Sequence, residues 1–521
     1  MRRRDLLELV GLGIPALVFE PPVVCAQREA SSGLSPTPAE SAIGVIPKNY
    51  GYPPLNVFRY GAVGDGITDD GAAIRSAWLV AKQQGGGTIV FPNAATYLVS
   101  SLDPSSPTKL PQQQSSGSIL YLPYQTQLYF QNGSNVVFDF QGSVLRTTVT
   151  GGGAFIMLDG CSNIRMLGPK ITGSQVMSSG VVSLGSITGG SGYTTGTYHN
   201  VPLTGGSGGG AVADIVVSGG AVTSVTVTYP GGSYVMGDTL SCGSANIGGK
   251  GSGFSVPVSS VSGAGPKVAV AAPNAIVCTA LAQPSKNITI TDLDVSAMYT
   301  ALYVVGDPKS PNTITHLSLL GHTRARNGEY GVALHDSGDD CLVENLYTYR
   351  VNRPFFFYGV QNVNVTCVGD QTGFGFAPVV KAYSRSTRNI TIRYSAINQP
   401  GQSGAVAKIN FQVQHDPAVI DPPPTVQAVS LDYDESNMTS GGNGIQFDYY
   451  AGPGGLTRQS SSSHQLFNNF VIRGSTNNTV LTTVAFNTAT AQCEINLGKL
   501  QFKRPRAAND LDNNGFKGSG K

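Results

Sequence analysis

The stretch Asn56-Val-Phe-Arg-Tyr-Gly-Ala-Val-Gly-Asp-Gly-Ile-Thr-Asp-Asp-Gly-Ala-Ala-Ile74 is the most informative part of this chain, together with Gly85-Gly-Gly-Thr-Ile-Val-Phe-Pro92 and Thr96-Tyr-Leu-Val99. Its first five residues alternate apolar and polar side chains as a strand does, and the following glycines permit the positive φ angles of tight turns. Apolar residues then recur at helical spacing through Trp78 and Ala81, until Gly85 ends the pattern. The stretch predicts a strand, a turn, a short helix and a further strand.

Three aspartates lie in this stretch, at positions 65, 69 and 70. We interpret Asp65, Asp69 and Asp70 as turn and helix-cap residues, because a carboxylate before a helix accepts hydrogen bonds from the free amides of its first turn. Such a cluster would also suit a metal, but the cap explains it more simply. The helix is predicted to cover the open end of a stack of strands.

This pattern resembles the N-terminal part of the pectate lyase-like superfamily of right-handed parallel β-helix proteins, which includes polygalacturonase-related and family 3 pectate lyase-like proteins. The resemblance implies an all-β solenoid with an N-terminal capping helix, and a protein that acts on polysaccharides. A solenoid grows by adding coils, so 521 residues need no second core.

Composition supports a large β protein and excludes several functional classes. Charged residues make up 12% of the chain, which contains 66 glycines and a single tryptophan. A net charge of +2 predicts no binding to nucleic acid. No stretch approaches the roughly 20 apolar residues of a membrane span.

The chain is predicted to contain five kinds of segment. Residues 1–26 resemble a twin-arginine export signal, which predicts a periplasmic or secreted protein. The predicted boundaries are an export signal at 1–26, a linker at 27–50, the β-helix at 51–183 and 263–500, an inserted Gly-rich β subdomain at 184–262, and a polar tail at 501–521. The insert resembles small β modules of bacteriophage tail proteins, and it is either a binding module or a spacer.

Six cysteines remain after the signal, at scattered spacings that fit neither a zinc site nor a compact disulfide framework. We interpret them as buried thiols of the coil core, with one or two disulfides left open.

A weak repeat runs through the chain, in which an asparagine precedes a branched residue, as at Asn135, Asn163, Asn287, Asn362 and Asn389. The step from Asn362 to Asn389 is 389 − 362 = 27 residues, which fits one coil of a solenoid. A second strand follows in each repeat. Because side chains alternate across a strand, six residues of these strands are predicted to face the core: Leu302, Leu334, Phe357, Ala382, Ile409 and Phe447.

The neighbours of these core residues must point outward, and they form a predicted ladder of aromatic and polar groups on adjacent coils, roughly 4.8 Å apart. Sugar rings stack on aromatic faces, and their hydroxyls or carboxylates bind lysine, asparagine and aspartate. A solvated sheet with no ligand would also show polar residues. The predicted ladder comprises Tyr303, His335, Phe356, Tyr358, Lys381, Tyr383, Lys408, Asn410, Gln446 and Asp448.

Arginine-bearing turns precede two of these strands, with Arg324 before one strand and Arg350 and Arg353 before the next. Guanidinium groups match carboxylates and sulfates in bidentate geometry, so these turns are candidates for binding an acidic glycan. Ordinary surface arginines are the alternative.

The element Gly338-Asp-Asp-Cys341 is similar to the Gly-Asp-Asp-Cys element of the polygalacturonase family, in which paired aspartates act as acid and base. The resemblance implies that Asp339 and Asp340 are catalytic. His335 begins the same segment, His335-Asp-Ser-Gly-Asp-Asp-Cys341. The Asn-Thr-Asp, Gly-His-Gly and Arg-Ile-Lys elements of that family are missing here. An aspartate-rich turn between coils explains the sequence equally well.

Three functions remain open, with glycoside hydrolysis slightly preferred. β-Elimination on an acidic glycan is the second, with a base drawn from His335, Lys381 and Lys408 or a tyrosine, and arginines as neutralisers. A glycan-binding, adhesive β-helix of tailspike type is the third. Asp448 is a further catalytic candidate, no cofactor is expected, a calcium ion at the turn of residues 336–340 is possible, and homo-oligomers are possible.

Overall fold

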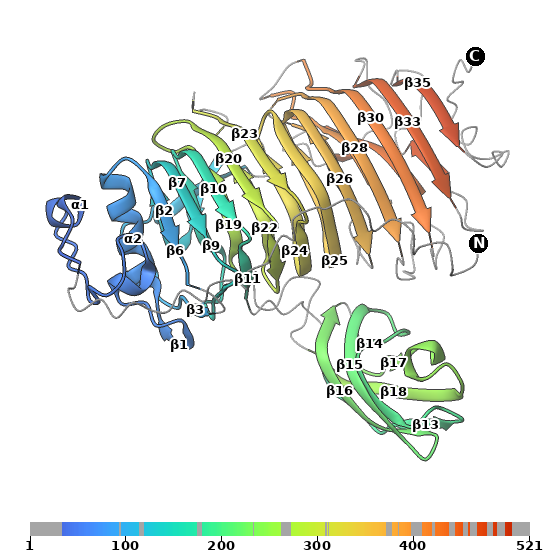
Figure 1. Cartoon of the computed structure of the whole chain (residues 1–521). Helices are drawn as coiled ribbons and strands as arrows, with labels where there is room; N and C mark the ends of the chain where they lie inside the picture. Colours follow the sequence, from blue (N-terminus) through green and yellow to red (C-terminus); the bar gives the residue numbers. More distant parts are fainter. Residues whose placement is uncertain are drawn as a thin grey trace, which may run out of the picture.

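The computed structural model shows an elongated stack of parallel strands with a small module at its side (Figure 1). The chain is a right-handed parallel β-helix with small antiparallel sheets as inserts, which confirms the predicted fold class. Most of the predicted export signal and tail lies outside the residues that the structure describes. These residues are 34–92, 95–113, 119–173, 180–232, 234–261, 272–307, 310, 312–370, 378–383, 385–397, 409–418, 422–436, 443–451, 457–458, 466–476, 483–486 and 495–502.

The parallel pairings place the coil strands in three sheets, with β24 (Arg324–His335) and β25 (Cys341–Tyr358) long enough to bend from one sheet into the next. Sheet 1 contains β2 (Gly87–Val90), β7 (Ser134–Asp139), β10 (Ser162–Leu167), β20 (Ser285–Thr291), β23 (Ile314–Leu320), the start of β25, β26 (Gln361–Asp370), β28 (Thr387–Ile397), β30 (Val426–Ser436), β33 (Phe467–Thr476) and β35 (Ile495–Phe502). Sheet 2 contains β1 (Asp65–Asp69), β3 (Thr96–Leu98), β8 (Val144–Arg146), β11 (Lys170–Thr172), β21 (Asp294–Ser296), the start of β24 and the middle of β25. The ends of β26, β28, β30 and β33 continue from sheet 1 into sheet 2. Sheet 3 contains β6 (Gln125–Gln131), β9 (Gly153–Asp159), β19 (Asn274–Thr279), β22 (Thr300–Val305), the ends of β24 and β25, β27 (Val379–Ala382), β29 (Ile409–Gln414), β31 (Asn443–Ala451) and β34 (Thr483–Phe486). The strand β31 also pairs with β32 (Thr457–Arg458), which runs antiparallel to it.

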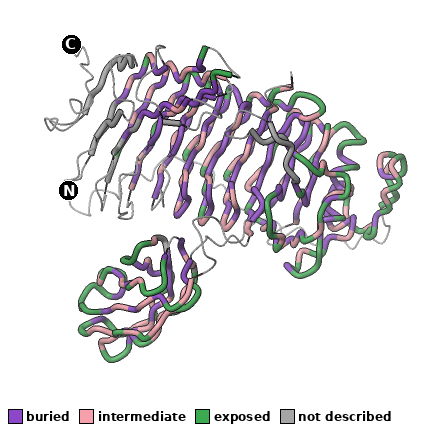
Figure 2. Tube along the Cα trace, turned by 180° about the vertical axis from the view of Figure 1, so that it is seen from behind, coloured by how far each residue is buried: buried purple, intermediate pink, exposed green. Residues whose placement is uncertain are grey.

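One continuous apolar core fills the space between the three sheets, as the buried stripes along the coils show (Figure 2). The six predicted inward positions are all fully buried in this core, so that prediction is confirmed. Each leucine, isoleucine or phenylalanine among them contributes roughly 1.5–3 kcal/mol relative to an exposed side chain. The alternation therefore fixes which residues face outward on sheet 3.

The repeated asparagines mark one corner of the coil, just before or at the start of sheet 1. Asn135, Asn163 and Asn287 have φ angles between 54° and 57°, a left-handed conformation that asparagine tolerates better than most residues. The Asn163 amide donates to Asn135 Oδ1 at 3.0 Å, and the Asn287 amide donates to Asn163 Oδ1 at 3.0 Å. This row of asparagine hydrogen bonds, the asparagine ladder, holds successive coils in register.

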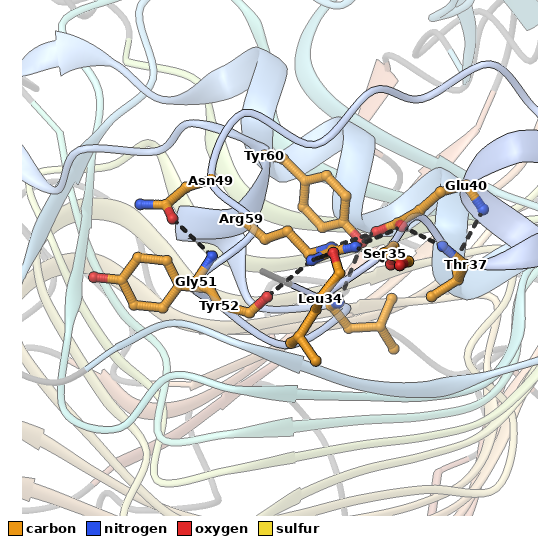
Figure 3. Close-up of polar contacts among 10 residues, drawn as sticks. Leu34, Ser35, Thr37, Glu40, Asn49, Gly51, Tyr52, Arg59 and Tyr60 are labelled. Atoms are coloured by element: carbon orange, nitrogen blue, oxygen red, sulfur yellow. Dashed lines mark hydrogen bonds and ion pairs between the residues drawn. The ribbon is translucent and has the colours of Figure 1, made fainter. Parts of the chain in front are cut away.

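A buried ion pair ties the N-terminal segment to the first coil (Figure 3). α1 (Pro38–Ala42) carries Glu40, whose Oε1 accepts from Arg59 Nε of η1 (Val57–Tyr60) at 2.6 Å, and both side chains are fully buried. The Tyr60 hydroxyl donates to the same carboxylate at 2.9 Å. These bonds lower the pKa of Glu40 to about 2 against the opposing effect of burial, which is the largest single influence. A linker is predicted at 27–50, whereas residues 34–50 fold onto the stack. The ion pair between Glu40 of this segment and the buried Arg59 holds it there.

α2 (Gly71–Gln83) covers the end of the stack, as predicted, with Trp78 packed on Phe130 at 4.8 Å between ring centroids. Asp70 precedes the helix, but its carboxylate accepts from the amides of Val63 and Gly64, while Asp69 accepts from the helix amide of Gly71. These aspartates therefore hold turns and the helix start. Among the described helices, none is long and apolar enough to cross a membrane.

The inserted module leaves the stack after β11 and returns at β19, which is the corner between sheets 2 and 3. It has its own apolar core, separate from that of the coils. Despite the interruption, β10 pairs directly with β20 and β11 with β21. The module consists of β12 (Val181–Leu184), β13 (Thr188–Ser191), β14 (Gly196–Pro202), β15 (Gly209–Ser218), β16 (Ala221–Gly232), β17 (Thr239–Leu240), η2 (Ser244–Ile247) and β18 (Ser252–Val261).

Every cysteine in the described part of the chain is a buried free thiol, as predicted. Cys161, Cys278, Cys341 and Cys367 lie in the coil core, and Cys242 lies in the inserted module.

Candidate functional site

The outward residues of sheet 3 stack in two columns that follow from the strand register. One column contains Tyr303, Ala333, Phe356, Val379, Asn410 and Gln446. The other contains Val305, His335, Tyr358, Lys381, Gln412 and Asp448. Eight of the ten predicted ladder residues lie in these two columns, whereas Tyr383 follows β27 and Lys408 lies outside the described residues.

The centre of these columns forms a compact group, the His335 cluster, defined as Tyr303, His335, Arg353, Phe356, Tyr358 and Lys381. The imidazole of His335 lies 5.0 Å from the Phe356 ring and 5.5 Å from the Tyr358 ring, measured between centroids. Its Nδ1 lies 3.3 Å from the Tyr303 hydroxyl, while its Nε2 is buried and has no hydrogen-bond partner among the described residues. Of these residues, only Tyr358 is buried, at 6% exposed, and the others are half-buried.

Lys381 is the strongest candidate for proton transfer in this cluster. Its ammonium lies 5.1 Å from the centroid of the Tyr358 ring and 5.6 Å from that of Tyr383. It has no salt bridge among the described residues. Burial and then the positive charge of Arg353 lower the pKa of Lys381 to about 8, although Asp336 opposes the shift. An amine with this pKa is partly neutral near physiological pH, as a general base requires.

His335 is held neutral by its surroundings. Burial, and then the positive charges of Lys381 and Arg353, lower the pKa of His335 to about 3. At neutral pH the ring therefore offers one donor and one acceptor nitrogen, and no charge. Such a ring binds a hydroxyl of a ligand better than it removes a proton from carbon.

The corner between sheets 2 and 3 adds polar groups beside the cluster. Arg353 lies 5.2 Å from the Phe356 ring and 5.6 Å from the Tyr330 ring, measured from Cζ to each centroid. Behind it, the Asn352 amide donates to Glu329 Oε1 at 2.8 Å, and Asn352 Oδ1 is buried with no partner in the described part of the chain. Burial raises the pKa of Glu329, against the effects of Asn352 and Arg353.

Asp339 and Asp340 lie in the turn that leads from sheet 3 to sheet 1, and their contacts are those of turn residues. Both carboxylate oxygens of Asp339 are bound by Arg385, at 2.7 and 3.1 Å, and by Gln361, at 3.0 Å to its backbone and side-chain nitrogens. Asp340 occupies the asparagine-ladder position with φ of 56°, and it accepts from the Asn362 amide at 2.8 Å. The catalytic assignment of this pair stays a prediction that these contacts do not favour.

The later coils place other predicted residues beyond the cluster. Asp448 is 1% exposed and accepts from the Asn410 amide at 2.8 Å. Tyr383 follows β27, and its buried ring stacks on Tyr358 at 5.9 Å. The backbone of Gln446 pairs with that of Asn410, and Lys408 lies outside the described residues.

The arginines predicted to lie in turns belong to strands instead, because Arg324 begins β24 and both Arg350 and Arg353 lie within β25. Arg353 joins the His335 cluster, whereas Arg324 is exposed on sheet 2. Arg350 is buried, and its backbone has a left-handed φ of 54°. Its Cζ lies 4.5 Å from the centroid of the Tyr349 ring, and it interacts electrostatically with Tyr234 of the inserted module. Only Arg353 is placed to meet a ligand on sheet 3.

Sequence reasoning missed Gln412, which is half-buried and follows Lys381 in its column. The signal was present, because Gln412 continues the alternation two residues after Asn410. Within the described residues, no three His, Cys, Asp or Glu side chains gather to hold a metal ion, and the engagement of Asp339 by Arg385 gives no support to calcium at this turn.

No protein-family profile matches the sequence, and no curated protein matches it significantly. The structure is similar to the A-module of mannuronan C-5 epimerase AlgE6 from Azotobacter vinelandii, at 12% identity and a TM-score of 0.31 over 87% of this chain and 100% of that one. It is also similar to an exopolygalacturonase of Thermotoga maritima, at 8% identity and a TM-score of 0.32 over 89% of this chain and 95% of that one. The surface adhesin PfbA of Streptococcus pneumoniae is similar at 12% identity and a TM-score of 0.32, over 87% of this chain and 100% of that one. These neighbours include two proteins named as enzymes and one named as an adhesin, and the likeness assigns no activity to this chain.

Proposed function

We propose that the His335 cluster binds an acidic glycan and cleaves it by β-elimination. The observation that carries this proposal is the position of Lys381, whose pKa is lowered to about 8, in one column with the neutral His335 and near the cationic Arg353. A base, a positive charge for a carboxylate and hydroxyl donors are the groups that elimination from a uronic acid requires.

The proposed reaction balances with the residues of the cluster. The neutral amine of Lys381 takes the proton on the carbon next to the carboxylate, the bond from the neighbouring carbon to the glycosidic oxygen breaks, and a carbon–carbon double bond forms. Arg353 offsets the negative charge that develops on the carboxylate. Tyr303 or Tyr358 donates a proton to the leaving oxygen. Burial raises the pKa of both phenols, so both carry their proton at neutral pH.

Hydrolysis is the second candidate, and one observation favours it. A glycosidase needs a carboxylic acid that stays protonated, and Glu329 is a buried carboxyl with a raised pKa beside the cluster. Glu329 is therefore a better acid candidate than Asp339, which is bound by Arg385.

Incubation with polygalacturonate, polymannuronate and a sulfated glycosaminoglycan tests the proposal. Elimination gives products with a new ultraviolet-absorbing double bond, and loss of that signal in Lys381→Met is the expected result. New reducing ends without the double bond would overturn elimination in favour of hydrolysis, with Glu329→Gln as the diagnostic variant. Binding without products would leave a glycan-binding protein.

A further inference from the structure

The two columns of sheet 3 change character at β22. Upstream of this strand, Tyr129, Met157 and Val277 face outward, as Val305 does at the end of β22 itself, yet all four are buried in an apolar cluster separate from the coil core. Leu110 covers this cluster from the antiparallel hairpin of β4 (Lys109–Gln113) and β5 (Ile119–Pro123), together with Tyr124, which follows it directly.

This covering is anchored by specific contacts. Leu110 and Tyr124 are 1% and 6% exposed. The Asn274 amide of β19 donates to the Tyr124 hydroxyl at 2.9 Å, which fixes the base of the hairpin to sheet 3. The hairpin therefore occupies the surface that a ligand would need on the upstream coils.

The covered region ends directly beside the His335 cluster. Val305 belongs to the covered apolar cluster, and it pairs in register with His335 on the next coil. Tyr303 lies at the boundary, since its ring packs against the apolar cluster and its hydroxyl meets His335 Nδ1. One coil step, about 4.8 Å, thus separates the covered Val305 from His335, and two further steps along the same column lead to Lys381.

The columns continue only in the other direction. Lys381 and Gln412 follow His335 and Tyr358 in register, and both are half-buried and in contact with solvent. A glycan that lies along these stacked side chains can extend from the cluster towards β29, but not towards β9.

We infer that the β4–β5 hairpin makes the His335 cluster a site for the end of an acidic glycan chain. This inference rests on the proposed function and adds the mode of action, in which short products leave from one chain end. An internal segment of a polymer would have to pass through the space that Leu110 and Tyr124 fill.

Binding to end-tethered glycans tests the inference without requiring cleavage. Oligogalacturonates and oligomannuronates are immobilised through the reducing end or through the non-reducing end, and Lys381→Met protein is passed over both surfaces. Binding in one orientation only is the expected result. Equal binding in both orientations would overturn chain-end recognition but not the proposed function. If the protein bound neither surface, the proposed function would be overturned as well.

A shortened hairpin provides the matched variant. The Tyr124 amide already donates to the Thr108 carbonyl at 2.8 Å, so a two-glycine turn can replace residues 109–123 and join these ends. We expect this variant to bind both tethered orientations equally and, with Lys381 present, to lower polymer viscosity faster for each double bond formed. Unchanged orientation preference in the shortened variant would overturn the role of the hairpin. Leu110→Ala, which keeps the hairpin, should shift the preference in the same direction, and a thermal unfolding curve for each variant confirms that the coil core is intact.

Discussion

The outer face of sheet 3 has two halves built on the same strand register. In the upstream half, Tyr129, Met157 and Val277 lie under a hairpin in an apolar cluster. In the downstream half, His335 and Lys381 face outward in the neighbouring column, after the covered Val305, and remain in contact with solvent. Backbone geometry cannot explain this difference, because the alternation and spacing of the strands are the same.

The difference shows that the strands of sheet 3 only set where the outward side chains lie. The β4–β5 hairpin determines which of these side chains are buried and which remain in contact with solvent. Apolar side chains under the hairpin gain stability by leaving water, at roughly 25 cal/mol per Å² of buried apolar surface. Ionisable side chains just beyond its edge are partly desolvated, which lowers the pKa of both His335 and Lys381. We therefore expect outward residues under the hairpin to contribute to stability and those beyond its edge to contribute to activity. The following substitutions test this expectation.

The largest effect is expected for Lys381→Met in the downstream half. Removing a general base typically costs 10²–10⁴-fold in rate, and we expect a loss of that order in kcat with the melting temperature nearly unchanged. Double-bond formation on an acidic glycan measures the rate. Lys286→Met, which alters an exposed lysine of sheet 1, is the control. Full activity of Lys381→Met would remove the amine from the mechanism.

Met157→Ala in the upstream half should act on stability instead. Met157 is fully buried under the hairpin, and truncation of such a side chain costs about 2–5 kcal/mol of unfolding free energy. Denaturant unfolding measures this loss. Thr289→Ala on the outer face of sheet 1 is the control, for which we expect a change within about 0.5 kcal/mol. A fall in kcat for Met157→Ala as large as that of Lys381→Met, with unchanged stability, would contradict the structural role that we assign to the upstream half.

The pH profile sharpens the assignment of the base. Because the neutral amine is the active form, the rate should rise about tenfold per pH unit below the pKa of Lys381 and level off above pH 8 or so. Arg353→Met removes the neighbouring positive charge that lowers this pKa, so the plateau should move to higher pH. Rate measurements across this range on both proteins give the comparison. A rate that instead falls as the pH rises would point to a carboxylic acid such as Glu329, whose pKa is raised by burial.

The smallest effect is expected for Gln412→Ala, one coil beyond Lys381 of the cluster. One hydrogen bond to a ligand is worth about 0.5–1.5 kcal/mol, so KM should rise by about two- to tenfold while kcat stays constant. Thr391→Ala on sheet 1 is the control. An unchanged KM on long and short substrates alike would show that the ligand does not reach this coil.

The fold was predictable from local signals that repeat along the chain. The stretch from Asn56 to Val99 encodes the capping helix and first coil, and asparagines at left-handed corners such as Asn163 and Asn362 reveal the period. The ladder residues followed from alternation alone. Their order in two columns did not, because coil length varies and only the register of β22 to β31 fixes which residues are neighbours.

The site was harder to predict because its chemistry arises from long-range contacts. Asp339 and Asp340 form a recognisable motif, yet Arg385 and Asn362, which engage them, come from later coils. The covering of Val305 by Leu110 depends on a hairpin nearly 200 residues away, since 305 − 110 = 195. The linker predicted for 27–50 differs from the folded segment for the same reason, since the requirement of Arg59 for Glu40 is visible only in three dimensions.

The asparagine bond from Asn287 to Asn163 spans 124 residues of sequence, because the whole inserted module leaves and rejoins the chain between them. The entropy of closing such a loop grows only slowly with its length, so a coil can open at the corner between sheets 2 and 3, where the module inserts, at little thermodynamic penalty. The same corner is therefore a permissive junction for protein engineering: a foreign domain with adjacent termini could replace the native module, while the lateral pairing of β10 with β20 keeps the two flanking coils aligned.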